Sequence, residues 1–223
     1  GKSMDVLRAA AFEMQKSGRF RITGREWGDL IRPYVKTEIQ GKPHYSDIQL
    51  IDPLVSACVL RLRNDEYEFP HRIYQEVLAG WKLSEMPAAE VENTVTARTS
   101  EGIEGIRPRW YMSLRFAAER NSKIADRLFA LAEKDDDRYG LAVARILPAR
   151  GNPERNIWAL RRLARHYGRT KARVRGTRDA SHTGLDDERT FVARLRAAGR
   201  DGESILKNME PRLRDDDLLD IFL

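Results

Sequence analysis

Residues 150–178 read RGNPERNIWALRRLARHYGRTKARVRGTR, and this stretch concentrates the positive charge of a chain of 223 residues. It holds ten lysine and arginine residues and one acid, Glu154, which gives a net charge of +9, whereas the whole chain carries +6. The rest of the chain is therefore net negative, at −3. Positive charge gathered on a helical segment suits phosphate, because each Lys or Arg laid on a phosphate releases condensed counterions.

The same stretch predicts two helices. Asn152-Pro153 begins the first, because proline is favoured at the first helical position, and this helix is expected to end at Tyr167. The second is expected from Thr170 to about Thr177. Upstream, similar periodicity predicts helices over 5–17, 54–62, 88–97, 108–119, 122–133 and 136–146. Strand-like alternation is scarce, so the predicted fold class is mainly α, a compact array of short helices.

Two further patterns refine this fold. Thr23 and Glu26 have the spacing of a capping box and predict that a helix follows them. A glycine-containing loop is expected over 100–107, and it is the candidate boundary between two closely packed halves. These halves would be 4–99 and 107–223, the second with the basic segment 152–178; a single compact body is the alternative.

Composition limits the class of protein. Charged residues make up 33% of the chain, which fits a soluble protein with a large charged helical surface. No apolar run approaches the roughly 20 residues of a membrane span, and no signal peptide is recognisable at the start. The single cysteine, Cys58, allows no intramolecular disulfide and favours a reducing compartment. We therefore expect a cytoplasmic protein that does not span a membrane.

Within the basic stretch, the spacing of Leu163-Ala164, Gly168, Thr170 and Val174 resembles a helix-turn-helix DNA-binding motif over about residues 158–178. A small residue at Ala164 lets two helices cross closely, and Gly168 can adopt the left-handed turn conformation. Thr170 can cap the second helix, while Val174 packs back onto the first. The resemblance is at the level of the motif and covers about 20 residues.

This resemblance implies a nucleic-acid interface and assigns its residues. Three basic residues of the second helix would enter a major groove, and those of the first would contact flanking phosphates. The candidate nucleic-acid-binding residues are Arg161, Arg162, Arg165, Arg169, Lys171, Arg173, Arg175 and Arg178. Duplex DNA is favoured over RNA as the partner. One short recognition helix buries little surface, so specific binding calls for a homodimer or a multiprotein assembly.

Other interpretations stay open at this point. The arginines can bind nucleic acid backbone without reading bases, or form a solvated, salt-bridged helix face. From another class, the chain can be a helical adaptor whose apolar, acidic end, residues 218–223, docks on a partner. The aromatic and basic residues of 107–116 suggest base stacking or, equally, core packing.

Enzymatic signatures are weak, so the sequence favours a binding protein over an enzyme. The closest approach to a metal-dependent nuclease is Asp29 or Asp47 with the 38–40 segment, which lacks the required lysine. The four histidines have no spacing typical of a zinc site. No catalytic residue, metal ligand or cofactor is predicted.

Overall fold

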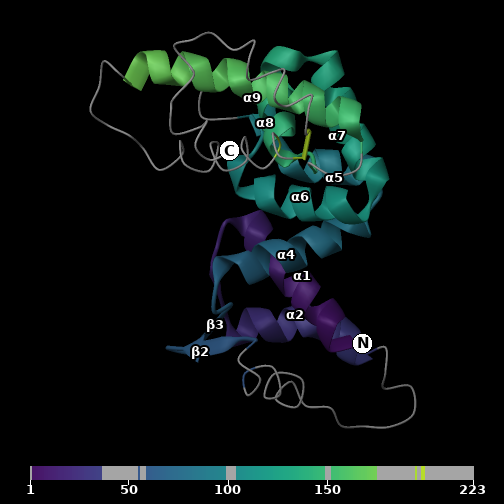
Figure 1. The fold of residues 1–223 in the computed structure, drawn as a ribbon. Coiled ribbons are helices and arrows are strands. Elements are labelled where there is room, and N and C mark those ends of the chain that lie inside the picture. The colour runs from purple at the N-terminus through teal and green to yellow at the C-terminus, as the bar shows by residue number, and fades with distance from the viewer. Residues whose placement is uncertain are drawn as a thin grey trace. The chain divides into compact units, whose positions relative to one another are not determined.

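The computed structural model describes residues 2–36, 55, 59–98, 104–148 and 152–174, together with residues 194, 197 and 198. Regular structure in these residues is mainly helical, which confirms the predicted fold class (Figure 1). The described residues divide into two compact units. The first consists of Gly1–Val95 with Pro108–Asn121, and the second of Thr96–Arg107 with Ser122–Leu223. The chain therefore passes from one unit to the other and back before it completes the second.

Three helices form the centre of the first unit. α4 (Arg72–Ser84) packs against α1 (Lys2–Ser17) on one side and α6 (Tyr111–Arg120) on the other (Figure 1). Gly18 follows the end of α1 with φ +71°, the left-handed conformation in which glycine stops a helix. The other described helices of this unit are α2 (Gly24–Lys36), α5 (Ala88–Val95) and η1 (Pro108–Trp110).

The first unit also holds a small antiparallel sheet with the strand order β1-β3-β2. Its strands are β1 (Arg21–Thr23), β2 (Arg61–Arg63) and β3 (Glu66–Glu68). Asn64 and Asp65 join β2 to β3 with φ of 53° and 61°, and both residue types tolerate this left-handed region in a two-residue turn. The predicted helix over 54–62 is therefore wrong at its end, because the turn pairs Leu62 with Tyr67. Of its other positions, residues 54 and 56–58, with Cys58, lie outside the described residues.

The capping box is confirmed at the start of α2. The backbone N–H of Thr23 donates to the Glu26 carboxylate at 2.9 Å, and the backbone N–H of Glu26 donates to the Thr23 hydroxyl at 3.3 Å. The pKa of the Glu26 carboxyl is lowered, mainly by the hydrogen bond from the Thr23 backbone and next by the hydrogen bond from the Arg19 side chain. The box fixes the point where the chain leaves β1 and enters the helix.

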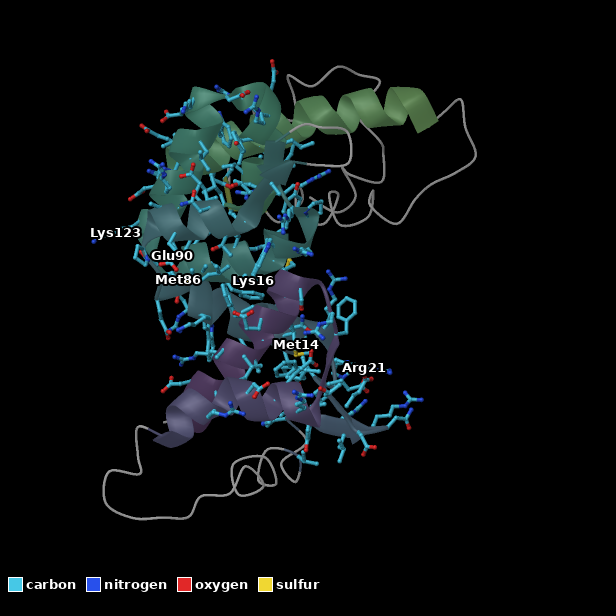
Figure 2. All side chains as sticks on the ribbon, turned by 180° about the vertical axis from the view of Figure 1, so that it is seen from behind. Met14, Lys16, Arg21, Met86, Glu90 and Lys123 are labelled. Atoms are coloured by element: carbon cyan, nitrogen blue, oxygen red, sulfur yellow. The ribbon has the colours of Figure 1, made fainter. Side chains whose placement is uncertain are left out.

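Aromatic side chains fill the core of the first unit. Trp27 and Trp110 are fully buried, and the Trp110 ring lies 5.7 Å from that of Phe12. Figure 2 shows Met14 inside this unit and Arg21 at its edge. The burial of Trp110 excludes it as a surface for stacking bases and supports the core interpretation of this tryptophan.

A buried carboxylate in α4 gives the first unit a pH-dependent stability. Glu76 is 8% exposed and accepts a 2.8 Å bond from exposed Arg72, but burial outweighs this partner and raises its pKa above 4.5. The folded state thus binds the proton more tightly than the unfolded state, so stability is reduced at neutral pH and regained as pH falls through the folded pKa.

We expect Glu76→Gln to be more stable than the parent in urea unfolding at about pH 7, with the difference vanishing at about pH 4. An equal difference at both pH values would contradict this.

In the described residues, the second unit combines a strand pair, β4 (Thr96–Arg98) and β5 (Glu104–Ile106), with the helices α7 (Ser122–Lys134), α8 (Asp136–Ile146) and α9 (Pro153–Val174). The loop expected over 100–107 is wrong at 104–106, which forms β5 and pairs with β4. α8 packs against α7, α9 and β5, so it is the central element of this unit.

Candidate nucleic-acid interface

The long helix α9 carries most of the basic stretch. Asn152 accepts a 3.1 Å hydrogen bond from the backbone N–H of Arg155, and Pro153 occupies the first helical position, as predicted. Buried residues recur with helical period along the side that faces the unit. They are Asn156, Ala159, Leu160 and Leu163.

The start of α9 is fixed from its buried side as well. Arg194, which is 1% exposed, donates from Nη1 to the side chain of Asn156 at 3.1 Å and from Nη2 to the carbonyl of Leu147. Asn156 in turn donates to the carbonyl of Arg194 at 3.2 Å. This anchoring sets which side of α9 faces solvent.

α9 has no break at Gly168. The predicted boundary after Tyr167 is wrong, because the helix continues through Gly168 to Val174. Glycine in a helix interior costs roughly 1 kcal/mol relative to alanine. Good helix formers in the turns around Gly168 offset this cost, namely Ala164, Arg165, Arg169, Lys171 and Ala172. The resemblance of residues 158–178 to a helix-turn-helix motif therefore rests on sequence spacing alone.

The continuous helix places basic positions on one side. Positions 161, 165, 169 and 173 are all arginine and repeat every four residues, so each lies about 40° around the axis from the one before. We call these four positions the arginine stripe. Arg161 is exposed, and within the described part of the chain its side chain has no recorded hydrogen bond or ion pair. The description of side chains in α9 ends at Leu163.

Arg162 is placed differently from Arg161. Its Nη2 forms an ion pair with the carboxylate of Asp136 and donates to the backbone carbonyl of the same residue at 2.6 Å. Gly140 leaves the room for this contact, because a Cβ there would lie 2.1 Å from Asp136 Oδ1 and 2.8 Å from Arg162 Nε. Arg162 thus joins α9 to α8, and its guanidinium is already occupied.

The remaining predicted site residues fall into two groups. Arg165, Arg169, Lys171 and Arg173 lie on the α9 backbone, beyond the described side chains. Arg175 and Arg178 lie outside the described residues altogether.

The arginine stripe carries an internal electrostatic cost. Like charges four residues apart destabilise a helix by roughly 0.2–0.5 kcal/mol per pair, and no acidic residue follows Glu154 in α9 to offset this. Arg155, outside the stripe, is neutralised by Asp126 at 2.6 Å and stacks over Phe129. A bound polyanion would relieve the repulsion along the stripe.

The structure adds two exposed arginines that the sequence analysis missed. Arg61 and Arg63 point to one face of the edge strand β2, and neither has a recorded partner among the described residues. Asn64-Asp65, a turn-forming pair between two short alternating runs, is the sequence signal that could have predicted this hairpin and its exposed arginines. Charged side chains on an edge strand also prevent sheet-to-sheet pairing, so we leave these two out of the interface.

The described residues do not support the nuclease-like or metal-binding sites considered from the sequence. Asp29 is exposed and paired with Arg32 at 2.6 Å, whereas Asp47 and the 38–40 segment lie outside the described residues. Among the residues described, no group of three or more His, Cys, Asp or Glu side chains is arranged to hold a metal ion. No described helix is both long and apolar enough to cross a membrane.

Arg162 is ion-paired and Arg161 is exposed, so replacing them should have different effects on stability. We expect Arg162→Gln to lower the free energy of unfolding by about 1 kcal/mol, because it breaks the partly exposed ion pair with Asp136. Arg161→Gln, which removes a charge one residue away, should leave stability within about 0.5 kcal/mol of the parent. Urea denaturation of both variants checks this, and equal losses would mean that Arg162 is not a structural residue.

Comparison of the chain with protein-family models, with curated proteins and with solved structures found no match.

Proposed function

We propose that this chain binds nucleic acid through the arginine stripe of α9, with duplex DNA as the preferred partner. One observation carries the proposal: a continuous helix has arginine at every fourth position from 161 to 173, with no acidic residue after Glu154 within the helix. Exposed Arg161 begins this stripe, and the buried side of the helix is fixed to the second unit.

The dimensions of the stripe fit a duplex. Positions 161 and 173 are twelve helical steps apart, which is about 18 Å at 1.5 Å per step. A major groove is about 12 Å wide, so arginines at the two ends of the stripe can contact phosphates on both sides of it. Because the stripe rotates gradually around α9, its arginines can contact phosphates at different angles around the helix axis.

Phosphate contacts give affinity without sequence information, so the proposal is backbone binding and does not depend on base readout. Lys171 lies off the stripe, and base contacts from it or from Arg175 and Arg178 would be additional. A single helix buries little surface, so a homodimer or a larger assembly fits best. A cytoplasmic regulator or accessory factor in replication, packaging or mobile-element biology would use binding of this kind.

The test is fluorescence anisotropy of the purified chain with labelled duplex DNA, single-stranded DNA and RNA of equal length. Each is titrated from low to physiological salt. We expect tightest binding to the duplex and a logarithmic salt slope of about −3 to −4, because each phosphate contact contributes about −0.9. Absence of binding to all three at about 50 mM salt would reject the proposal and favour the adaptor function.

A further inference from the structure

The solvent side of the first turns of α9 is shaped as a shallow, partly apolar depression. It has a volume of about 360 Å³, with lining residues Asp136, Glu154, Ile157, Trp158, Arg161 and Arg162. We call it the α9 shelf. Residues 154, 157, 158 and 161 follow helical spacing along one side, so this shelf continues directly into the arginine stripe.

Trp158 makes the shelf a surface for apolar groups. Its ring meets Phe129 edge-on at 5.1 Å, which fixes its orientation, while the residue stays only half-buried. Ile157, which also lines the shelf, is likewise half-buried. The charges that line the shelf are balanced, because Asp136 and Glu154 stand against Arg161 and Arg162. The excess positive charge lies on the arginine stripe that continues from it, so an occupant of both surfaces carries apolar side chains for the shelf and negative charge for the stripe.

One segment of this chain has that chemistry. Residues 215–223 read DDDLLDIFL, with four aspartates and five large apolar residues and no basic residue. Arg194 already lies against Asn156 in the first turns of α9, and twenty residues, 195–214, connect it to this segment. At up to about 3.3 Å per residue, they are long enough to bring the segment to the shelf.

We propose that residues 215–223 dock on the α9 shelf and compete with nucleic acid for the arginine stripe. Apolar side chains of the segment cover Trp158 and Ile157, and its aspartates meet Arg161 and the stripe beyond it. Tethering gives the segment an effective concentration in the millimolar range, so a weak intrinsic contact suffices. The competition, though not the docking itself, rests on the proposed function.

The docking is tested without nucleic acid. A fluorescein-labelled peptide of residues 215–223 is titrated by anisotropy into the chain lacking 215–223 and into the full chain. We expect saturable binding to the shortened chain and at least about tenfold weaker binding to the full chain, whose own segment occupies the shelf. A control peptide with Leu218, Leu219 and Phe222 changed to serine keeps the charge and should bind about tenfold more weakly.

Two chain variants locate the site. Trp158→Ala and Arg161→Glu in the shortened chain should each weaken peptide binding, and the second keeps the test valid if the first does not fold. Trp81→Ala, in the first unit, is the matched control and should leave peptide binding unchanged. Unchanged binding to both shelf variants, or no binding of the peptide at all, overturns the docking.

The competition is measured with duplex DNA at about 50 mM salt, where removal of 215–223 should raise affinity about tenfold. Peptide binding without DNA binding by either chain would leave the docking in place and reject the proposed function. DNA binding that is equal in both chains, with no peptide binding, would leave the proposed function in place and reject the docking.

Discussion

Replacing Arg161, Arg165 and Arg169 together with glutamine is expected to lower the affinity for duplex DNA about 1000-fold at about 50 mM salt. Each phosphate contact contributes about 0.9 to the logarithmic salt slope, so the loss of three reduces its magnitude by about 2.7. Glutamine has nearly the helix propensity of arginine, so α9 should persist. Anisotropy titrations over a range of salt concentrations measure both the affinity and the slope.

The control for this variant removes the same charge elsewhere. Arg25, Arg61 and Arg63 are exposed, and none has a recorded partner within the described residues. Their triple replacement with glutamine changes the net charge equally but should weaken binding less than about tenfold, through long-range attraction alone. Equal losses in the two triple variants would mean that overall charge, and not the arginine stripe, governs binding.

Gly80→Ala is expected to destabilise the first unit by about 2 kcal/mol, although alanine is the better helix former. A Cβ at this position would lie 2.5 Å from the backbone oxygen of Ser113 and 2.8 Å from Phe116 Cβ. Both atoms belong to α6, and the backbone oxygen cannot move without displacing the helix. Thermal unfolding should show a melting temperature lower by roughly 10 °C.

A second glycine provides the comparison. Gly24 begins α2 in the same unit, and a Cβ there would meet only Tyr67, at an ordinary contact distance of 3.8 Å. Gly24→Ala should therefore leave the melting temperature nearly unchanged or raise it slightly. A loss as large as that of Gly80→Ala would show that the close approach of α4 and α6 is not the cause.

Features set by neighbouring residues were predictable from the sequence. Thr23 with Glu26 and Asn152 with Pro153 act within one turn of helix, and both predicted starts are confirmed. The helices over 122–134 and 136–146 agree with prediction for the same reason, since apolar period and caps are local signals.

Features set by distant residues were not predictable. The pairing of Arg162 with Asp136 joins positions 26 apart, and nothing in either segment distinguishes Arg162 from exposed Arg161. The strand β3 is paired on both sides, with β1 and β2, and its three residues are too few for alternation to be recognised. The spacing around Gly168 predicts a turn because glycine favours one locally, whereas the helix formers in the neighbouring turns continue the helix through it.

The division of the chain between two units sets an order for folding during synthesis. α6 packs against α4 across Gly80, yet it is separated from α4 in sequence by the 96–107 segment, which belongs to the second unit. The first unit therefore cannot close when residue 95 leaves the ribosome and must wait for residue 121. Until then the apolar side of α4 lacks its partner, so nascent chains released between these points are the ones that chaperones and proteases should capture.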